Sequence, residues 1–120
     1  ATILVVEDDP DVRSIVVGIL SEFDCVVIEA EDGESALARL DENQNIDVLF
    51  TDVVLPGGMS GPDIAGEARN RKPDLKIILT SGYPDGETNE LAPDNSQPWF
   101  IRKPYRRTDL ADLLDQVLQS

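Results

Sequence analysis

Residues 3–12 read ILVVEDDPDV, a continuous apolar run that passes through three acidic residues into a proline. A continuous apolar run indicates a strand that is buried on both faces, as in a parallel sheet. Asp9 followed by Pro10 favours the start of a helix, with Asp9 as the N-cap and Pro10 at the first helical position. Apolar residues then follow a helical period as far as Phe23. The stretch therefore predicts a buried strand that leads into an amphipathic helix, with carboxylates at the junction.

The same alternation continues along the rest of the chain. Four further apolar runs, each predicted as a buried strand, lie at residues 26–28, 48–50, 77–79 and 99–101. Segments with helical spacing lie at residues 34–43, 62–71 and 110–118. Residues 83–98 hold three prolines and a single large aliphatic residue, which predicts only a short or frayed helix within a long loop. Five strands alternating with helices predict an α/β fold with a parallel sheet and helices on both faces. Periodicity leaves the strand order open.

Composition limits the classes of function. The chain has 120 residues, which predicts one domain over residues 1–120, and 24 Asp and Glu against 10 Lys and Arg give a formal net charge of −14. Such a charge disfavours direct binding to nucleic acid or to a membrane surface. The single cysteine, Cys25, excludes an internal disulfide and indicates a reducing compartment such as the cytoplasm. The first residues lack an initiator Met and a basic segment, so we expect an excised domain and not a signal peptide.

Reactive side chains directly follow four of the predicted strands. Glu7 and Asp8, Asp52, Thr80 and Lys103 would all converge at one edge of a parallel sheet, where α/β proteins place their sites. Three clustered carboxylates repel one another unless a cation lies among them, and hard oxygen ligands suit Mg²⁺. A carboxylate beside a divalent cation and an ammonium group is suited to attack phosphorus. The sequence therefore favours a magnesium-dependent phosphoryl site.

Each of these residues also has an ordinary structural interpretation. Glu7 and Asp8 suit the first turn of a helix, where carboxylates interact favourably with the helix dipole. Asp52 could be a residue that ends a strand at a turn. Thr80 could cap a helix, and Lys103 could be a solvated surface lysine. The combination favours the functional interpretation, because the structural ones would have to apply independently at every position.

Four segments together resemble the receiver domain of two-component response regulators. They are VVEDDP at 5–10, TDVVLP at 51–56 with Gly61 beyond it, LTSGY at 79–83 and FIRKPY at 100–105. The resemblance covers essentially the whole chain. It implies a flavodoxin-like, doubly wound fold of three layers, in which five parallel strands in the order 2-1-3-4-5 are flanked by five helices.

The resemblance also implies roles for individual residues. Asp52 would be the phospho-acceptor, and Mg²⁺ would be held by Glu7, Asp8, Asp52 and the backbone carbonyl of Val54. This magnesium site would be the only cofactor site.

Further residues would act on the phosphoryl group and on the response to it. Thr80 and Lys103 would grip the phosphoryl group, a cis peptide before Pro104 would aim the lysine, and Phe100 would occupy the position of the switch aromatic. Because the chain contains no histidine, the phosphoryl group would come from a partner histidine kinase or histidine phosphotransfer protein. The domain would then switch conformation and regulate a partner or an attached domain.

Two local features point to a subgroup of receivers. The segment GGMS at 57–60 is one residue longer than usual, and SGY at 81–83 replaces a more frequent alanine-containing segment, as in receivers of hybrid sensor histidine kinases or their stand-alone relatives. We expect a cytoplasmic monomer or weak dimer that is not a stand-alone enzyme. Two alternatives stay open from the sequence: a pseudo-receiver that binds partners without phosphorylation, and a flavodoxin-like electron carrier.

Overall fold

A computed structural model describes residues 1–43, 45–55, 57–81, 99–103 and 105–119. The elements in chain order are β1 (Thr2–Val6), α1 (Pro10–Ser21), β2 (Val26–Ala30), α2 (Gly33–Glu42), β3 (Val48–Asp52), α3 (Gly61–Arg71), β4 (Lys76–Ser81), β5 (Trp99–Arg102) and α4 (Arg107–Gln119). The helix predicted within residues 83–98 lies outside the described residues, as does the proline after Lys103. Within the described residues, every strand and helix lies where the apolar pattern predicts it.

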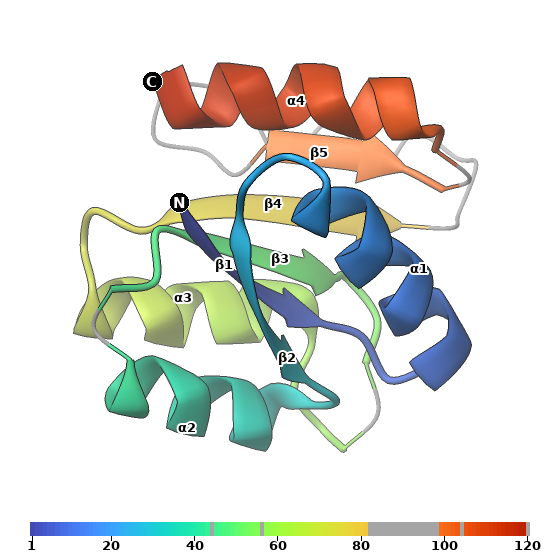
Figure 1. The fold of residues 1–120 in the computed structure, drawn as a ribbon. Coiled ribbons are helices and arrows are strands. Elements are labelled where there is room, and N and C mark those ends of the chain that lie inside the picture. The colour runs from blue at the N-terminus through green and yellow to red at the C-terminus, as the bar shows by residue number, and fades with distance from the viewer. Residues whose placement is uncertain (44, 56, 82–98, 104, 120) are drawn as a thin grey trace.

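The five strands form one parallel sheet in the order β2-β1-β3-β4-β5, which confirms the expected topology. Helices α2 and α3 cover one face of the sheet, and α1 and α4 cover the other (Figure 1). Successive residues of a strand point to opposite faces. Accordingly, Leu4 and Val6 of β1 belong to the core under α2 and α3, whereas Ile3 and Val5 belong to the core under α1 and α4. The three-layer α/β prediction is confirmed.

The prediction that every strand is buried on both faces is wrong for two of them. The central strands β1, β3 and β4 are buried along nearly their whole length, but β2 and β5 are only partly buried. Val26 of β2, for example, is 61% exposed. These two strands are the outer strands of the sheet, where the covering helices extend less far over the strand. An apolar run records that a strand lies in a sheet, but not whether it lies at the centre.

Side chains fix the start of each of the first three helices. Asp9 accepts a hydrogen bond from the backbone N–H of Asp11 at 2.9 Å and Pro10 follows it, which confirms the predicted N-cap of α1. Helices α2 and α3 begin with capping boxes, formed by Asp32 with Ser35 and by Ser60 with Asp63. Caps satisfy N–H groups that have no partner within the helix. They therefore fix the residue at which each strand-to-helix connection ends.

The Asp32 cap gives a pH-dependent contribution to stability. The Ser35 backbone N–H donates to Asp32 Oδ1 at 2.8 Å and the Ser35 hydroxyl donates to the same oxygen at 2.7 Å, which holds the pKa of Asp32 below its usual range. We expect Asp32→Ala to lower the free energy of unfolding by about 1 kcal/mol at pH 7. Because the folded-state pKa is depressed, this contribution is complete above the unfolded pKa of about 4 and declines as the pH falls through the folded value.

Urea unfolding of wild type and variant at pH 7 and pH 3 measures this effect. The difference between the two proteins should shrink at pH 3. Asp32→Asn is the matched control, because it keeps an acceptor oxygen without a titrating group and should stay close to wild type at pH 7. A difference between Asp32→Ala and wild type that is equally large at both pH values would contradict the charge-dependent part of the cap.

Candidate functional site

The carboxyl ends of four strands bring the reactive residues to one edge of the sheet. Glu7 directly follows β1, Asp52 ends β3, Thr80 lies near the end of β4 and Lys103 directly follows β5. In the register of the sheet, Asp52 is paired with Thr80, and the Lys103 backbone N–H donates to the Ser81 carbonyl at 2.8 Å. Side chains from distant parts of the sequence therefore meet because parallel strands all end on the same side.

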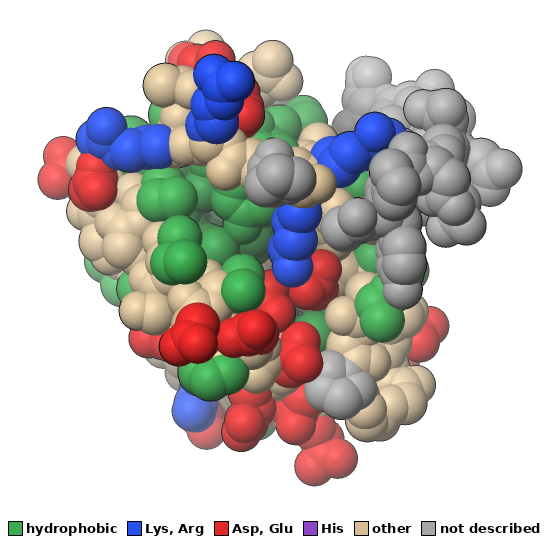
Figure 2. Space-filling model, turned by 90° about the vertical axis from the view of Figure 1, so that its right-hand side faces the viewer, with side chains coloured by type: hydrophobic (Ala, Val, Ile, Leu, Met, Phe, Trp, Pro, Cys, Tyr) green, Lys and Arg blue, Asp and Glu red, His purple; other side chains and the backbone are tan. Residues whose placement is uncertain are grey.

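Three carboxylates form an acidic cluster at this edge. Glu7, Asp8 and Asp52 each place an oxygen so that all three atoms lie within 4.8 Å of one another. Glu7 is only 5% exposed and Asp52 only 8%, whereas Asp8 is exposed. Figure 2 shows acidic side chains gathered on the face that lies at the carboxyl ends of the strands. Buried like charges at this spacing are unfavourable without compensation, so the cluster needs positive charge.

Lys103 supplies part of that charge. Its Nζ donates to Asp52 Oδ2 at 2.9 Å and to Glu7 Oε1 at 3.1 Å. Burial by itself lowers the pKa of Lys103, but the hydrogen bonds and negative charges of Asp52 and Glu7 outweigh it, so that the pKa lies above its usual value. The lysine is thus a fixed cation between two carboxylates. Three carboxylates and one ammonium group leave the cluster with a net negative charge. A divalent cation could compensate that charge.

The Thr80 hydroxyl is a buried donor beside the same carboxylate. Thr80 is 1% exposed, and its Oγ1 has no hydrogen-bond partner among the described residues. A buried polar atom without a partner costs free energy, and in a native structure it calls for an explanation. Its pairing with Asp52 in the sheet register places it where an oxygen bound to that carboxylate could accept a hydrogen bond.

The connection from β3 to α3 is tied by backbone hydrogen bonds to the end of β4 and to the residue that follows Asp52. The Val53 backbone N–H donates to the Thr80 carbonyl at 2.9 Å, and the Gly61 N–H donates to the Val53 carbonyl at 2.8 Å. Val54 between them is 56% exposed. Gly57 and Gly58 both have positive φ, 86° and 90°, a conformation that side chains disfavour. The loop between β3 and α3 therefore returns to the end of β3 through two glycines whose backbone is in the left-handed region.

Two residues near the site were not singled out by the sequence. Tyr105 packs edge-on against Phe50, with ring centroids 6.2 Å apart, and burial together with the charges of Glu7 and Asp52 raises the pKa of its hydroxyl. Arg13 donates from Nη1 to the Glu7 carbonyl at 2.7 Å. Tyr105 comes two positions after Lys103, and this proximity in the sequence could have marked it as a residue near the site. No sequence pattern marks Arg13. Phe100 is half-buried against the core under α2 and α3.

Comparisons with known proteins identify the family to which this fold belongs. The family model of the response regulator receiver domain matches residues 3–115. The chain is 34% identical over 120 residues to the sensor kinase CckA of Brucella abortus, covering 99% of this chain but only 13% of that kinase. It is 34% identical over 119 residues to the response regulator receiver protein CpdR of the same organism, covering 97% of this chain and 95% of CpdR.

Solved structures that resemble this fold are also receiver domains. The crystal structure of the receiver domain of the hybrid histidine kinase CckA superposes with a TM-score of 0.82 at 34% identity, covering 98% of this chain and 99% of that one. A response regulator receiver domain protein from Clostridium thermocellum superposes with a TM-score of 0.88 at 28% identity, covering 99% and 94%. The chain belongs to the receiver domains of two-component response regulators.

Membership places the chain in two-component signal transduction. Receiver domains as a class interact with histidine kinases or phosphotransfer proteins, and they bind Mg²⁺. Within the part of the chain that the structure describes, no helix combines the length and the apolar character needed to cross a membrane.

Proposed function

We propose that residues 1–120 form a single receiver domain whose Asp52 accepts a phosphoryl group from a phosphohistidine of a kinase or a histidine phosphotransfer protein. The observation that carries this proposal is the meeting of Asp52, Glu7 and Asp8 with the ammonium group of Lys103 at one sheet edge. The Thr80 hydroxyl, which has no hydrogen-bond partner among the described residues, adds a donor at the same place. The presence of the three carboxylates together with the lysine and the threonine supports a receiver that is phosphorylated. A pseudo-receiver, which binds partners without phosphorylation, would not need all of these residues.

The acidic cluster fits a hard divalent cation. Glu7, Asp8 and Asp52 would hold Mg²⁺, and the backbone carbonyl of Val54 would complete the protein's share of the ligands. When bound, Mg²⁺ supplies positive charge that neutralises the phosphoryl oxygens. Asp8 is the exposed member of the three and lies on the solvent side of the cluster, so it leaves an open approach for a partner's phosphohistidine.

The transfer itself requires one bond to form and one to break. A carboxylate oxygen of Asp52 forms a bond to phosphorus while the bond from phosphorus to the imidazole nitrogen breaks. The electron pair of that bond stays on the imidazole, which takes up a proton from solvent. Lys103 is hydrogen-bonded to Asp52 before transfer and would then donate to a phosphoryl oxygen. The Thr80 hydroxyl would donate to another.

Phosphorylation would act on partners by shifting an existing equilibrium. As Thr80 moves toward the phosphoryl group, Phe100 on the neighbouring strand would turn inward into the space that Thr80 leaves. A ligand or modification moves such an equilibrium only by its differential interaction with the two states. The aspartyl phosphate provides this difference, because only the switched state satisfies its oxygens.

The proposed partner surface includes two exposed apolar side chains on segments that follow the acidic residues in the chain. Ile15 on α1 is 63% exposed, and Val54, two residues after Asp52, is 56% exposed. A partner's helix that carries the phosphohistidine could cover both while its imidazole reaches Asp52. We further propose that the domain acts in the cytoplasm as a monomer or weak dimer, without nucleic-acid contacts, and that it is similar to the receivers of hybrid histidine kinases or their stand-alone relatives.

Transfer of labelled phosphoryl from a phosphorylated histidine phosphotransfer protein tests the proposal. Wild type should become labelled in Mg²⁺ and remain unlabelled in EDTA, and Asp52→Asn should remain unlabelled in both, because an amide oxygen is a poor nucleophile. Asp112→Asn is the matched control: it removes an exposed carboxylate on α4 and should be labelled like wild type. Equal labelling of Asp52→Asn and wild type would overturn the assignment of the acceptor.

A further inference from the structure

We propose that Arg13 is a positioning residue that fixes the peptide joining Glu7 to Asp8 and thereby sets the affinity of the acidic cluster for Mg²⁺. This inference rests on the metal site proposed above. Arg13 itself would not touch the metal or the phosphoryl group. It would act through the backbone of the two acidic residues.

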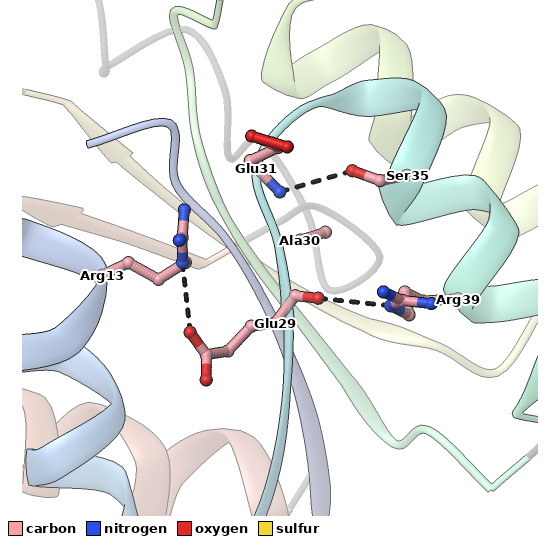
Figure 3. Close-up of a pocket in the computed structure, with 6 residues that line it drawn as sticks. All are labelled: Arg13, Glu29, Ala30, Glu31, Ser35 and Arg39. Atoms are coloured by element: carbon pink, nitrogen blue, oxygen red, sulfur yellow. Dashed lines mark hydrogen bonds and ion pairs between the residues drawn. The ribbon is translucent and has the colours of Figure 1, made fainter. Parts of the chain in front are cut away.

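Arg13 links α1 to β2 and to the segment that follows β1, next to the acidic cluster. From α1, its Nη1 donates to the Glu7 carbonyl at 2.7 Å and its Nε donates to Glu29 Oε1 of β2 at 3.1 Å. The side chain is only 21% exposed. Figure 3 shows it directed at Glu29 on the wall of a pocket of about 180 Å³, which Arg39 lines from the side of α2. The guanidinium group is therefore held at two points.

The carbonyl that Arg13 binds belongs to the peptide between the two acidic residues. In an extended strand, consecutive side chains point to opposite faces, so Glu7 and Asp8 could not both face one cation. The chain instead leaves β1 after Val6 and bends at Asp8, and the two carboxylates lie within 4.8 Å of each other. Holding the carbonyl of this peptide fixes the rotation that sets the direction of Asp8 relative to Glu7.

Other bonds restrain Glu7 and its surroundings without contacting the carbonyl between Glu7 and Asp8. The Glu7 backbone N–H donates to the Ala30 carbonyl at 3.1 Å, which fixes the peptide before Glu7. Its carboxylate accepts from Lys103 Nζ and, at 3.2 Å, from the Asp9 backbone N–H. Charge-assisted hydrogen bonds are among the stronger ones. Among the hydrogen bonds of the described residues, the Arg13 bond is the one that acts directly on the carbonyl between the two carboxylates.

Electrostatics and positioning predict opposite results for removal of Arg13. Its positive charge repels a divalent cation nearby, so loss of the charge alone would tighten Mg²⁺ binding. Loss of the restraint frees Asp8 to turn away, so loss of positioning weakens binding. Residues that orient metal ligands typically change affinity by about 10-fold or more when removed. The sign of the change therefore separates the two roles.

Calorimetric titration of metal-free protein with Mg²⁺ measures this sign. We expect Arg13→Ala to weaken binding by about 10-fold and Arg13→Lys, which keeps the charge and one donor group, to lie between it and wild type. Arg39→Ala is the matched control. Arg39 lines the same pocket, but its hydrogen bond in that pocket goes to the Glu29 carbonyl and not to Glu7. This variant should bind Mg²⁺ as tightly as wild type or more tightly. Urea unfolding in EDTA shows whether each variant is folded, and Arg13→Gln replaces Arg13→Ala if the latter is not.

Two failures can be told apart. If wild type binds no Mg²⁺, the proposed metal site is wrong, and the role of Arg13 falls with it. If wild type binds Mg²⁺ and a folded neutral variant at Arg13 binds it equally or more tightly, the metal site stands and the positioning role is overturned. A second readout is the rate of phosphorylation by a small-molecule phosphodonor. For Arg13→Ala it should approach the wild-type rate at saturating Mg²⁺, and a rate that stays low there would also overturn the inference.

Discussion

Gly61→Ala should lower the free energy of unfolding by about 3 kcal/mol or more, because the added methyl group has no space. A Cβ at this position would lie 2.1 Å from the Asp52 carbonyl oxygen, 2.9 Å from the Asp52 carbonyl carbon and 3.0 Å from the Val53 Cα. These are backbone atoms, so no side-chain rotation relieves the overlap. Either α3 has to move or the end of β3, which carries Asp52, has to move.

The same helix offers a matched control. Gly66 lies in the interior of α3 and is exposed, and a Cβ there would meet no atom within 4 Å. Gly66→Ala should therefore stabilise the protein by about 1 kcal/mol through helix propensity alone. Urea unfolding monitored by circular dichroism compares the three proteins. If Gly61→Ala were as stable as wild type, the close approach of α3 to the end of β3 would not exist in solution.

Gly61→Ala should also impair phosphoryl acceptance in whatever fraction remains folded. The overlap displaces the backbone of Asp52, whose carboxylate belongs to the acidic cluster. A displacement of about 1 Å at a reacting group is enough to slow a reaction about 100-fold. Comparing the phosphorylation rate per folded molecule with that of Gly66→Ala measures this effect separately from stability.

Lys103→Met should lower the free energy of unfolding by about 2 kcal/mol in EDTA, since it leaves Asp52 and Glu7 buried without their cation. Breaking a fully buried ion pair typically costs about 3–5 kcal/mol, and the smaller value reflects the partial exposure of the lysine. Counting side-chain atoms alone, Lys103 is 26% exposed, Asp52 is 12% exposed and Glu7 is 7% exposed. Millimolar Mg²⁺ should recover much of the loss in the variant, because a cation bound to the same carboxylates replaces the missing charge.

The pH dependence of this difference has a defined sign. The folded-state pKa of Lys103 is raised, so its contribution is complete below the unfolded value of about 10.4 and is lost as the pH rises through the folded value. Wild type and Lys103→Met should therefore differ fully at pH 7 and converge in strong alkali. Arg106→Met, which removes an exposed cation just before α4, is the control and should be nearly neutral. Lys103→Met as stable as wild type in EDTA would contradict the role of the lysine as the fixed cation of the cluster.

Local sequence patterns predicted most of the architecture. Apolar runs placed the strands, helical spacing placed the described helices, and Asp9 with Pro10 marked the start of α1. The site residues could be named because parallel strands end on the same side, so the residue after each strand is a candidate whatever the strand order. The order itself came from the resemblance, since periodicity reports which faces of a strand are buried and not which strands are neighbours.

What the sequence predicted by itself is the set of elements and the chemistry available at the strand ends, and the absence of histidine from residues 1–120 predicts that a phosphoryl donor lies outside them. Only the tertiary structure decided that β2 is partly exposed, that Gly61 lies against the Asp52 carbonyl and that Arg13 reaches the Glu7 carbonyl. The reason is physical. Burial periodicity is a property of each segment, whereas these contacts depend on how segments pack against one another and on the paths of the loops between them.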